Sequence, residues 1–185
     1  MAGLIAQIEL RPRRGKKGSR FQALVQSILS QQLSTKVADV IIARFINLYK
    51  PKKFPTPTDV LKTKDEKLRA LGISYSKISY IKNLAEHIEN KKLKLNTVHK
   101  LENEALIEHL VQVKGIGRWT AEMFMMFMLE RPDVFSHGDL GLKNAIIRLY
   151  KLKDPTPQKI ERIAKKWSPY KTLASRYLWA SLDNK

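Results

Sequence analysis

Two glycines one residue apart mark the first segment of this sequence with ligand-binding chemistry. Gly115 and Gly117 lie in the run VKGIGRWTA, residues 113–121, between two stretches with helical periodicity. Because glycine has no Cβ, backbone N–H groups at such positions face outward, and the helix that follows adds its positive N-terminal end. Lys114 and Arg118 flank the glycines. The run therefore predicts a phosphate-binding turn, and the alternative is an ordinary tight turn between helices.

A carboxylate is the second candidate. Asp139 lies in VFSHGDLGL, residues 134–142, just before an apolar helical pattern. An aspartate at a helix start accepts hydrogen bonds from the first backbone N–H groups, so an N-cap is the structural interpretation of this residue. The neighbouring His137 is a lone histidine in a turn, and no cluster of histidines or carboxylates predicts a catalytic divalent metal.

The net charge of the chain favours a polyanionic partner. The 185 residues include 35 Lys and Arg against 17 Asp and Glu, which is a formal charge of +18. Cations on phosphates release condensed counterions, so nucleic acid is the leading partner, and the alternative is a solvated, heat-adapted surface. Apolar residues make up 43% of the chain, which is enough for a core. The absence of cysteine excludes disulfide scaffolds, thiolate zinc sites and iron–sulfur clusters.

No run approaches the roughly 18 consecutive apolar residues of a membrane span, and the first residues lack the charged start of a signal peptide. We therefore expect an intracellular protein without membrane contact. In a prokaryote it would occupy the cytoplasm or nucleoid, and in a eukaryote the nucleus.

Helical periodicity dominates the chain, which predicts an all-α fold. Apolar residues of segment 21–30 form one stripe, at Phe21, Leu24, Val25, Ile28 and Leu29. Ser34 and Thr35 predict the cap of a second helix ending near residue 49, whose inner face we expect to carry Val37, Ile41, Phe45 and Leu48. Further helices are expected in segments 60–72, 76–90, 105–111, 119–129, 142–150, 157–167 and 173–182. Trp167, Tyr170, Met125, Met126 and Met128 are interpreted as core, and the basic segment 11–20 as a connector or phosphate-facing loop.

The hairpin run resembles that of the helix-hairpin-helix DNA glycosylases, whose pattern is L-P-G-[IV]-G-x-x-T-A, with Lys114 in place of the proline. Over residues 20–182 the chain resembles in particular the 3-methyladenine DNA glycosylase II family, through FQALVQSILSQQLS (21–34), GIGRWTA (115–121), DVF (133–135), KWSPY (166–170) and LW (178–179). A β-rich N-terminal domain often precedes this core, and we expect a minimal form without it.

The resemblance implies two helical lobes with a central cleft, within a single glycosylase unit of residues 1–185. The expected lobes are residues 21–105 and residues 1–20 plus 106–185. The implied function is that of a monofunctional DNA glycosylase, which flips alkylated purines of the 3-methyladenine and 7-methylguanine type out of duplex DNA. It would hydrolyse their N-glycosidic bond and so initiate base excision repair.

The resemblance also implies residue roles. Asp139 becomes the catalytic residue, since an anion stabilises the positive charge that builds on the sugar as the base departs. The expected base pocket consists of Trp119, Trp179 and Met123. The expected DNA contacts are Lys114, Gly115, Gly117, Arg118 and Thr120 of the hairpin, with Gln32 filling the gap that the flipped base leaves.

No cofactor is expected to be required. The resemblance implies a structural Na⁺ or K⁺ ion at the hairpin, held by the main-chain carbonyls of Val111, Val113 and Ile116. A monomer is expected, since one lesion needs one active site.

Two alternatives stay open. The first is a helix-hairpin-helix module that binds damaged DNA without catalysis. The second is a bifunctional glycosylase-lyase, which Trp119 disfavours because it occupies the position where such enzymes carry the lysine nucleophile. Lys143, one turn after Asp139, keeps some lyase activity conceivable.

Overall fold

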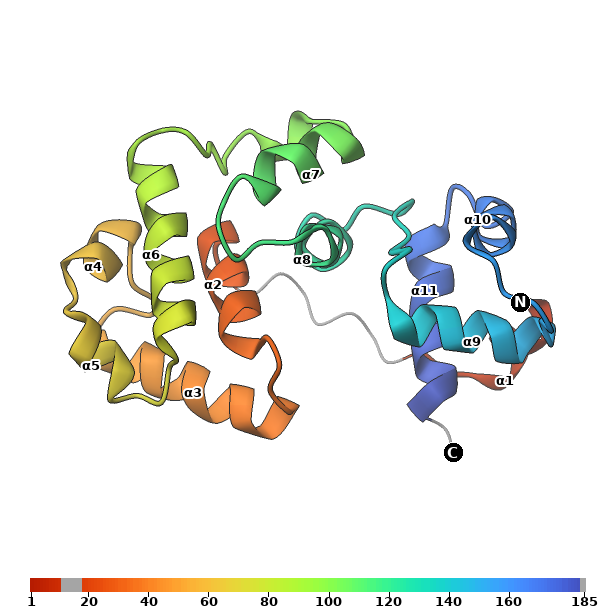
Figure 1. Cartoon of the computed structure of the whole chain (residues 1–185), viewed down its shortest axis with the longest axis horizontal. Coiled ribbons are helices and arrows are strands. Elements are labelled where there is room, and N and C mark those ends of the chain that lie inside the picture. The colour runs from red at the N-terminus through yellow and green to blue at the C-terminus, as the bar shows by residue number, and fades with distance from the viewer. Residues whose placement is uncertain (11–17, 184–185) are drawn as a thin grey trace. The chain divides into compact units, whose positions relative to one another are not determined.

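The computed structural model describes residues 1–10 and 18–183, and in this part of the chain every regular element is a helix (Figure 1). The predicted all-α class is therefore confirmed. Most of the expected basic connector, residues 11–17, lies outside the described residues. The elements are α1 (Ala2–Gln7), α2 (Arg20–Ser30), α3 (Thr35–Leu48), α4 (Pro57–Lys62), α5 (Asp65–Arg69), α6 (Tyr75–Glu89), the 3-10 helix η1 (Val98–Lys100), α7 (Asn103–Val111), α8 (Arg118–Met123), the π-helix η2 (Phe124–Met128), α9 (Leu140–Tyr150), α10 (Pro157–Lys165) and α11 (Lys171–Asp183).

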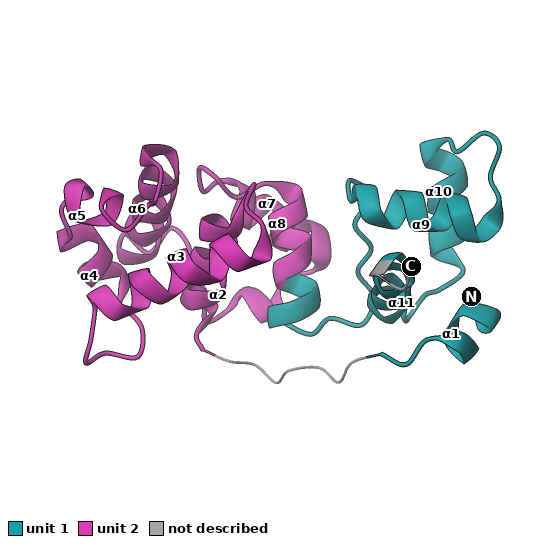
Figure 2. Cartoon of the chain, turned by 90° about the horizontal axis from the view of Figure 1, so that it is seen from below, with its two compact units in different colours: residues 1–16, 125–185 teal, residues 17–124 magenta. Residues whose placement is uncertain are grey.

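The chain divides into two compact units (Figure 2). Residues 17–124 form what we call the hairpin unit, and residues 1–16 with 125–185 form the aspartate unit. These boundaries differ from the expected lobes, which separated residues 21–105 from 106–185. The hairpin stays with α2–α6 because side chains of α6 and of the turn after α2 bind it, through Asn83 and Gln31.

The apolar stripe of α2 is buried throughout, as predicted. On α3, Ile41 and Phe45 are buried as predicted, but the placement of Val37 and Leu48 on the inner face was wrong, since they are 47% and 37% exposed. Ala38 is buried instead. Positions 38, 41 and 45 follow the three- and four-residue spacing of one helix face, and Val37 is rotated away from it.

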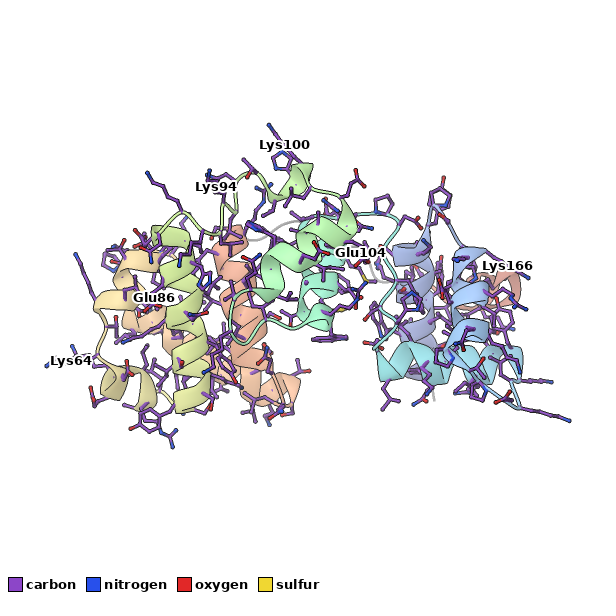
Figure 3. All side chains as sticks on the ribbon, turned by 45° about the horizontal axis from the view of Figure 1, so that its top comes forward. Lys64, Glu86, Lys94, Lys100, Glu104 and Lys166 are labelled. Carbon is purple, nitrogen blue, oxygen red and sulfur yellow. The ribbon has the colours of Figure 1, made fainter. Side chains whose placement is uncertain are left out.

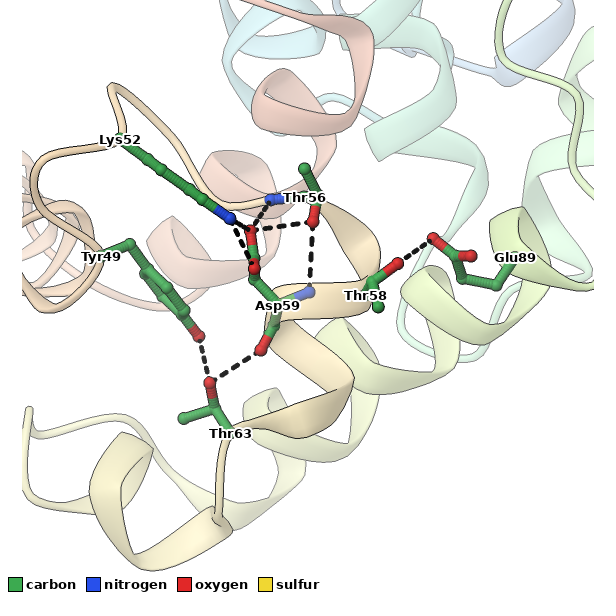
Figure 4. Close-up of polar contacts among 7 residues, drawn as sticks. All are labelled: Tyr49, Lys52, Thr56, Thr58, Asp59, Thr63 and Glu89. Atoms are coloured by element: carbon green, nitrogen blue, oxygen red, sulfur yellow. Dashed lines mark hydrogen bonds and ion pairs between the residues drawn. The ribbon is translucent and has the colours of Figure 1, made fainter.

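A polar cluster at the start of α4 fixes the connection from α3 (Figure 4). Thr56 and Asp59 form a capping box, and the two carboxylate oxygens of Asp59 each lie 2.8 Å from Nζ of Lys52. The hydrogen bond from Lys52 is the largest cause that lowers the pKa of Asp59, to about 2, and the hydrogen bonds from Thr56 add to it. The hydroxyls of Tyr49 and Thr63 are 3.0 Å apart, and burial raises the pKa of Tyr49. The loop is thereby anchored at both ends.

The core of the aspartate unit lies between α9, α10 and α11, which pack through Phe135, Leu142, Ala145, Ile146, Ile160, Ala164 and Leu178. Trp167 packs edge-on against Phe135, with ring centroids 5.8 Å apart, in keeping with its expected core role. The expectation for Tyr170 was wrong. Its side chain is 62% exposed, because it follows Pro169 in the turn between α10 and α11.

The segment expected to be one α-helix over residues 119–129 contains two helix types. The α-helix α8 ends at Met123, and the π-helix η2 continues to Met128. The wider π turn changes which side chains face inward. Met125 and Met126 are buried as predicted, Met128 is half-buried, and Phe127 is 53% exposed.

Among the described helices, none has the length and apolar character needed to cross a bilayer.

Candidate functional site

The predicted hairpin connects α7 to α8, and Gly115 is the residue that its geometry requires. Its φ of +92° lies in the left-handed region, which L side chains rarely adopt. A Cβ at this position would overlap the ring of Tyr80 from α6. The hairpin therefore depends on Gly115 both for backbone conformation and for close packing on α6.

Gly117 serves a different purpose. It is the N-cap residue of α8, it is exposed, and a Cβ built on it meets nothing within 4 Å. The backbone at Gly117 is consequently open to a ligand from solvent. Beside it, Lys114 is exposed, and its backbone N–H donates to Oδ1 of Asn83 at 2.9 Å.

Of the two remaining predicted contacts of the hairpin, Arg118 is paired inside the protein and Thr120 is buried. The guanidinium of Arg118 donates to both carboxylate oxygens of Glu104, labelled in Figure 3, at 2.9 and 2.6 Å. Its Nε also donates to Glu122 at 3.1 Å, and that carboxylate side chain is only 4% exposed. Arg118 thus braces α7 against α8. Thr120 is buried, with 4% of its surface exposed.

The carbonyl groups expected to hold a monovalent ion lie in the same connection. Val111 is the last residue of α7, and the carbonyl of Val113 accepts a hydrogen bond from the Ile116 N–H at 3.0 Å. Neutral carbonyl oxygens suit hard cations such as Na⁺ or K⁺. In the described part of the chain, no group of three or more histidine, cysteine or acidic residues forms a site for another metal.

Gln32 occupies an exposed turn between α2 and α3. Its φ of +57° is unusual for a residue other than glycine and is a source of backbone strain. On α8, Trp119 is 47% exposed and Met123, one turn further, is half-buried. These three residues belong to the hairpin unit.

Asp139 lies in the aspartate unit, as the N-cap of α9. Its Oδ1 accepts hydrogen bonds from the backbone N–H of Leu142 at 2.8 Å and from the indole Nε1 of Trp179 at 3.1 Å. The structural interpretation of Asp139 is therefore correct, and the structure adds a tie to one of the predicted pocket residues. The carboxylate is half-buried, and two N–H donors fix its orientation.

Two further residues shape this site. A Cβ on Gly141 would lie 3.1 Å from Oδ1 of Asp139 and 3.4 Å from Cδ1 of Trp179, so Gly141 lets the two side chains meet. The exposed ring of Phe127 lies beside Trp179, with centroids 5.9 Å apart. His137 is exposed, and its ring contacts that of Phe135 edge-on.

The irregular connection that leads to Asp139 is held by α11. The fully buried Thr172 donates its hydroxyl to the carbonyl of Arg131 at 2.6 Å and accepts from the N–H of Val134 at 3.2 Å. Asp133 accepts from the hydroxyl of Ser168 at 2.6 Å and from Nζ of Lys171 at 3.1 Å. The position of Asp139 therefore depends on the turn between α10 and α11 and on the first turn of α11.

Comparison with known proteins places this arrangement in a family. Residues 25–169 match the family described as HhH-GPD superfamily base excision DNA repair protein. The chain belongs to the HhH-GPD superfamily. The match includes the hairpin and Asp139, whereas Trp179 lies beyond it.

Individual relatives of this HhH-GPD protein are named as a DNA glycosylase and a DNA glycosidase-like protein. It is 37% identical to DNA-3-methyladenine glycosylase 1 of Schizosaccharomyces pombe over 172 residues, covering 91% of this chain and 75% of that protein. It is 33% identical to the alkylbase DNA glycosidase-like protein mag2 of the same organism, covering 86% of this chain and 76% of that protein.

Solved structures show the same fold. The S. pombe 3-methyladenine DNA glycosylase Mag1 in complex with abasic DNA superposes with a TM-score of 0.86 at 34% identity, covering 98% of this chain and 90% of that one. A DNA-3-methyladenine glycosidase from Bacillus halodurans superposes with a TM-score of 0.85 at 38% identity, covering 99% and 84%.

The sequence of this HhH-GPD protein did not predict that Phe127 lies beside Trp179, one of the expected pocket residues. The run FMMFM, residues 124–128, is apolar at every position, so no periodicity separates an exposed ring from the core. Its π-helical geometry exposes Phe127, and the packing of α11 brings Trp179 beside it. The sequence feature that could have indicated Phe127 is an aromatic residue next to three flexible methionines.

Proposed function

We propose that this HhH-GPD protein is a monofunctional DNA glycosylase that hydrolyses the N-glycosidic bond of alkylated purines, of the 3-methyladenine and 7-methylguanine type, in duplex DNA. The observation that carries the proposal is the Asp139 carboxylate, held at the start of α9 by the Leu142 N–H and the Trp179 indole. The relatives named as 3-methyladenine glycosylases support the substrate class. Such a reaction initiates base excision repair.

The chemistry needs a fixed anion. As the base departs, positive charge develops on the deoxyribose, and a carboxylate that is already oriented stabilises it without reorganising during the reaction. Asp139 meets this requirement through its two N–H donors, and it also serves as the acceptor that orients or deprotonates the attacking water. An alkylated purine already carries positive charge, so it leaves without a strong general acid.

Aromatic side chains supply recognition of the base. The Trp179 indole donates to Asp139 and lies beside the exposed ring of Phe127, and aromatic faces attract a cationic purine. In the hairpin unit, Trp119 and Met123 are the proposed further contacts to the flipped base. Base flipping gives these groups access to a purine that is stacked in the duplex.

The hairpin is proposed to bind the DNA backbone. Gly117 leaves room for a phosphate, Gly115 sets the turn and Lys114 adds an exposed cation. Arg118 braces the two helices that flank this hairpin, Thr120 is buried on α8, and Na⁺ or K⁺ on the carbonyls of the connection would hold its backbone in place. Gln32 is proposed to fill the gap in the duplex. The protein acts as a monomer in this proposal, which sedimentation with and without DNA tests.

The test is base release from methylated duplex DNA by the wild-type protein and by Asp139→Asn. Asparagine also caps helices, so this variant keeps α9 while it removes the negative charge. We expect wild-type protein to release 3-methyladenine and 7-methylguanine from strands that stay intact before alkali, and Asp139→Asn to lose at least about a hundredfold in rate. Asp154→Asn, at an exposed aspartate paired with Lys159 in the same unit, is the matched control and keeps wild-type activity.

Two outcomes would replace the proposal. Tight binding to damaged DNA without base release favours a non-catalytic binding module. Strand cleavage, with a protein–DNA adduct trapped by borohydride, favours a glycosylase-lyase. Lys143 is exposed on α9, with its backbone N–H on the carbonyl of Asp139 at 3.0 Å, and would be the nucleophile to substitute in that case.

A further inference from the structure

The turn between α2 and α3 has the backbone of a type II turn with an unfavourable residue in it. Gln31 has φ −52° and ψ 131°, Gln32 has φ +57°, and the N–H of Leu33 donates to the carbonyl of Ser30 at 3.2 Å. The third position of such a turn favours glycine, because its φ is positive. Gln32 occupies that position with an exposed side chain. The turn is therefore strained and presents Gln32 to solvent.

The neighbouring side chain leaves the turn and reaches the hairpin. Nε2 of Gln31 donates a hydrogen bond to the carbonyl oxygen of Gly115 at 2.9 Å, and the contact is partly buried. The two residues are 84 positions apart in the sequence. One glutamine thus binds the hairpin while the next one projects from the same turn.

The far side of the hairpin is held by α6. Oδ1 of Asn83 accepts from the Lys114 N–H at 2.9 Å, and the ring of Tyr80 fills the space where a Cβ of Gly115 would lie. The hairpin is consequently fixed on α6, and the Gln31 amide fixes the α2–α3 turn relative to it. Both ends of this link lie within the hairpin unit.

We propose that Gln31 is a positioning residue that couples the strand-binding hairpin to the side chain that probes the duplex. The inference rests on the proposed function, in which the hairpin holds the backbone and Gln32 enters the gap. Phosphates repeat at fixed spacing, so a side chain that replaces a base must be in register with the backbone contacts. The Gln31–Gly115 hydrogen bond sets that register.

Substitutions can separate the hydrogen bond from the shape of the side chain. Gln31→Glu keeps length and shape but replaces the donor by a carboxylate facing the Gly115 carbonyl. Gln31→Met keeps the length without a polar group. Gln26→Glu, at a half-buried glutamine earlier on α2, makes the same change in charge and is the matched control.

The experiment measures three quantities for each variant: single-turnover excision from methylated duplex, affinity for undamaged duplex by fluorescence anisotropy, and base flipping by 2-aminopurine fluorescence beside the lesion. We expect Gln31→Glu and Gln31→Met to lower excision and flipping about tenfold, with affinity for undamaged DNA within about twofold of wild type. Gln26→Glu stays at wild-type values. In a Gln32→Ala background, Gln31→Met adds less than about a twofold further loss, because the residue it positions is already absent.

Three results would overturn the assignment. Excision by both Gln31 variants within about twofold of wild type removes the need for the contact. An equal loss of excision and of undamaged-DNA affinity shows that Gln31 only supports the hairpin, and full additivity with Gln32→Ala shows that the two residues act independently. A wild-type protein that releases no base refutes the proposed function instead, and the anisotropy and flipping measurements then still decide whether Gln31 acts on Gln32.

Discussion

The side chain of Asp139 combines a structural and a proposed chemical role. As N-cap it satisfies a backbone N–H of α9, and the Trp179 indole approaches the same oxygen from α11. The helix cap and the aromatic neighbour together give the carboxylate one orientation, which is what stabilisation of a developing cation requires. A residue that appears structural from its sequence context can therefore also be the reactive group.

Gly141 tests whether this orientation matters. Gly141→Ala adds a Cβ 3.1 Å from Oδ1 of Asp139, which is tighter than ordinary contact, so the carboxylate or the Trp179 ring must shift. We expect a loss of about tenfold or more in the rate of base release. The melting temperature should change little, since alanine favours the helix by about 1 kcal/mol and offsets the strain.

Gly138→Ala is the matched control for Gly141→Ala. Its Cβ meets nothing within 4 Å, although the residue is adjacent to Asp139. We expect its rate of base release to equal that of wild type. Wild-type rates in Gly141→Ala would show that the contact between Asp139 and Trp179 has no part in catalysis.

The connections between helices carry most of the site. The hairpin between α7 and α8 owes its shape to α6, and the segment before α9 owes its position to α11. Neither segment has repeating backbone hydrogen bonds of its own. Their precision comes from side chains of distant helices, so substitutions in those helices are expected to alter function without touching the site.

The two hairpin glycines should separate stability from binding. Gly115→Ala forces a side chain into a left-handed conformation and against Tyr80, so we expect a loss of at least about 1 kcal/mol and a melting temperature lower by about 2 °C or more. Gly117→Ala meets no steric obstacle, so its loss of stability should be smaller and come only from the poorer N-cap of α8, but it places a methyl group where a phosphate is proposed to approach, which weakens DNA binding.

Thermal melting and fluorescence anisotropy measure these two effects. If Gly117→Ala binds DNA as tightly as wild type, the phosphate does not approach the backbone at that residue. If Gly115→Ala has the same melting temperature as wild type, the backbone relaxes around the new side chain, and the requirement for glycine is refuted.

The contacts of Asp133 predict a pH dependence of stability. Burial opposes its ionisation, but hydrogen bonds from Ser168 and Lys171 outweigh burial and hold the pKa of Asp133 below its usual value of 3.8. Such a group stabilises the folded state above the unfolded pKa, and this stabilisation is lost as pH falls through the lowered pKa. Asp133→Asn should therefore melt below wild type near neutral pH, by a difference that shrinks as the pH falls below about 4.

Melting curves at about pH 7 and about pH 3 measure that difference. The exposed Asp154, substituted by asparagine, provides the control for removal of one negative charge. A gap between Asp133→Asn and wild type that persists undiminished in acid would show that the carboxylate charge is not what binds the connection to α11.

The excess of cations over the entire chain, +18 in formal charge, suits a polyanionic partner. Exposed lysines are distributed over both units, including Lys64, Lys94 and Lys166 (Figure 3). Net charge alone does not distinguish a cation that contacts DNA from one that is neutralised by the protein. Two cations of the hairpin illustrate the difference: Arg118 is paired with Glu104 and Glu122, whereas the side chain of Lys114 is exposed.

The salt dependence of DNA affinity should differ between Lys114 and Arg118. Each phosphate contact contributes a slope of about −0.9 to the logarithm of affinity against the logarithm of salt. Lys114→Ala should reduce the slope by about 1, since its side chain is exposed. Arg118→Ala should leave the slope nearly unchanged and lower the melting temperature, because its guanidinium binds Glu104 and Glu122.

Titrations at several salt concentrations measure the slope for each variant. An equal reduction by Arg118→Ala would show that Arg118 exchanges its carboxylates for a phosphate when DNA binds.

Much of the fold and part of the site could be predicted from local patterns. The apolar stripe of α2, the helix after Ser34 and the position of Asp139 at a helix start all depend on residues within one or two turns of each other. For the same reason the hairpin and its family resemblance are visible in the sequence. Where two adjacent residues are both apolar, the local pattern does not show which of them is buried. For this reason Val37 was wrongly predicted on the inner face of α3, where Ala38 lies.

The sequence by itself thus determined the all-α class, the hairpin between two helices and the aspartate that begins α9, because short-range periodicity and capping specify such features. Only the tertiary structure decided that Trp179 meets Asp139 from 40 residues away, that Phe127 lies beside Trp179, and that Gln31 reaches Gly115 across 84 residues. These contacts arise from the packing of whole helices, and no pattern within a short segment records which distant side chain a helix will bring to its neighbour.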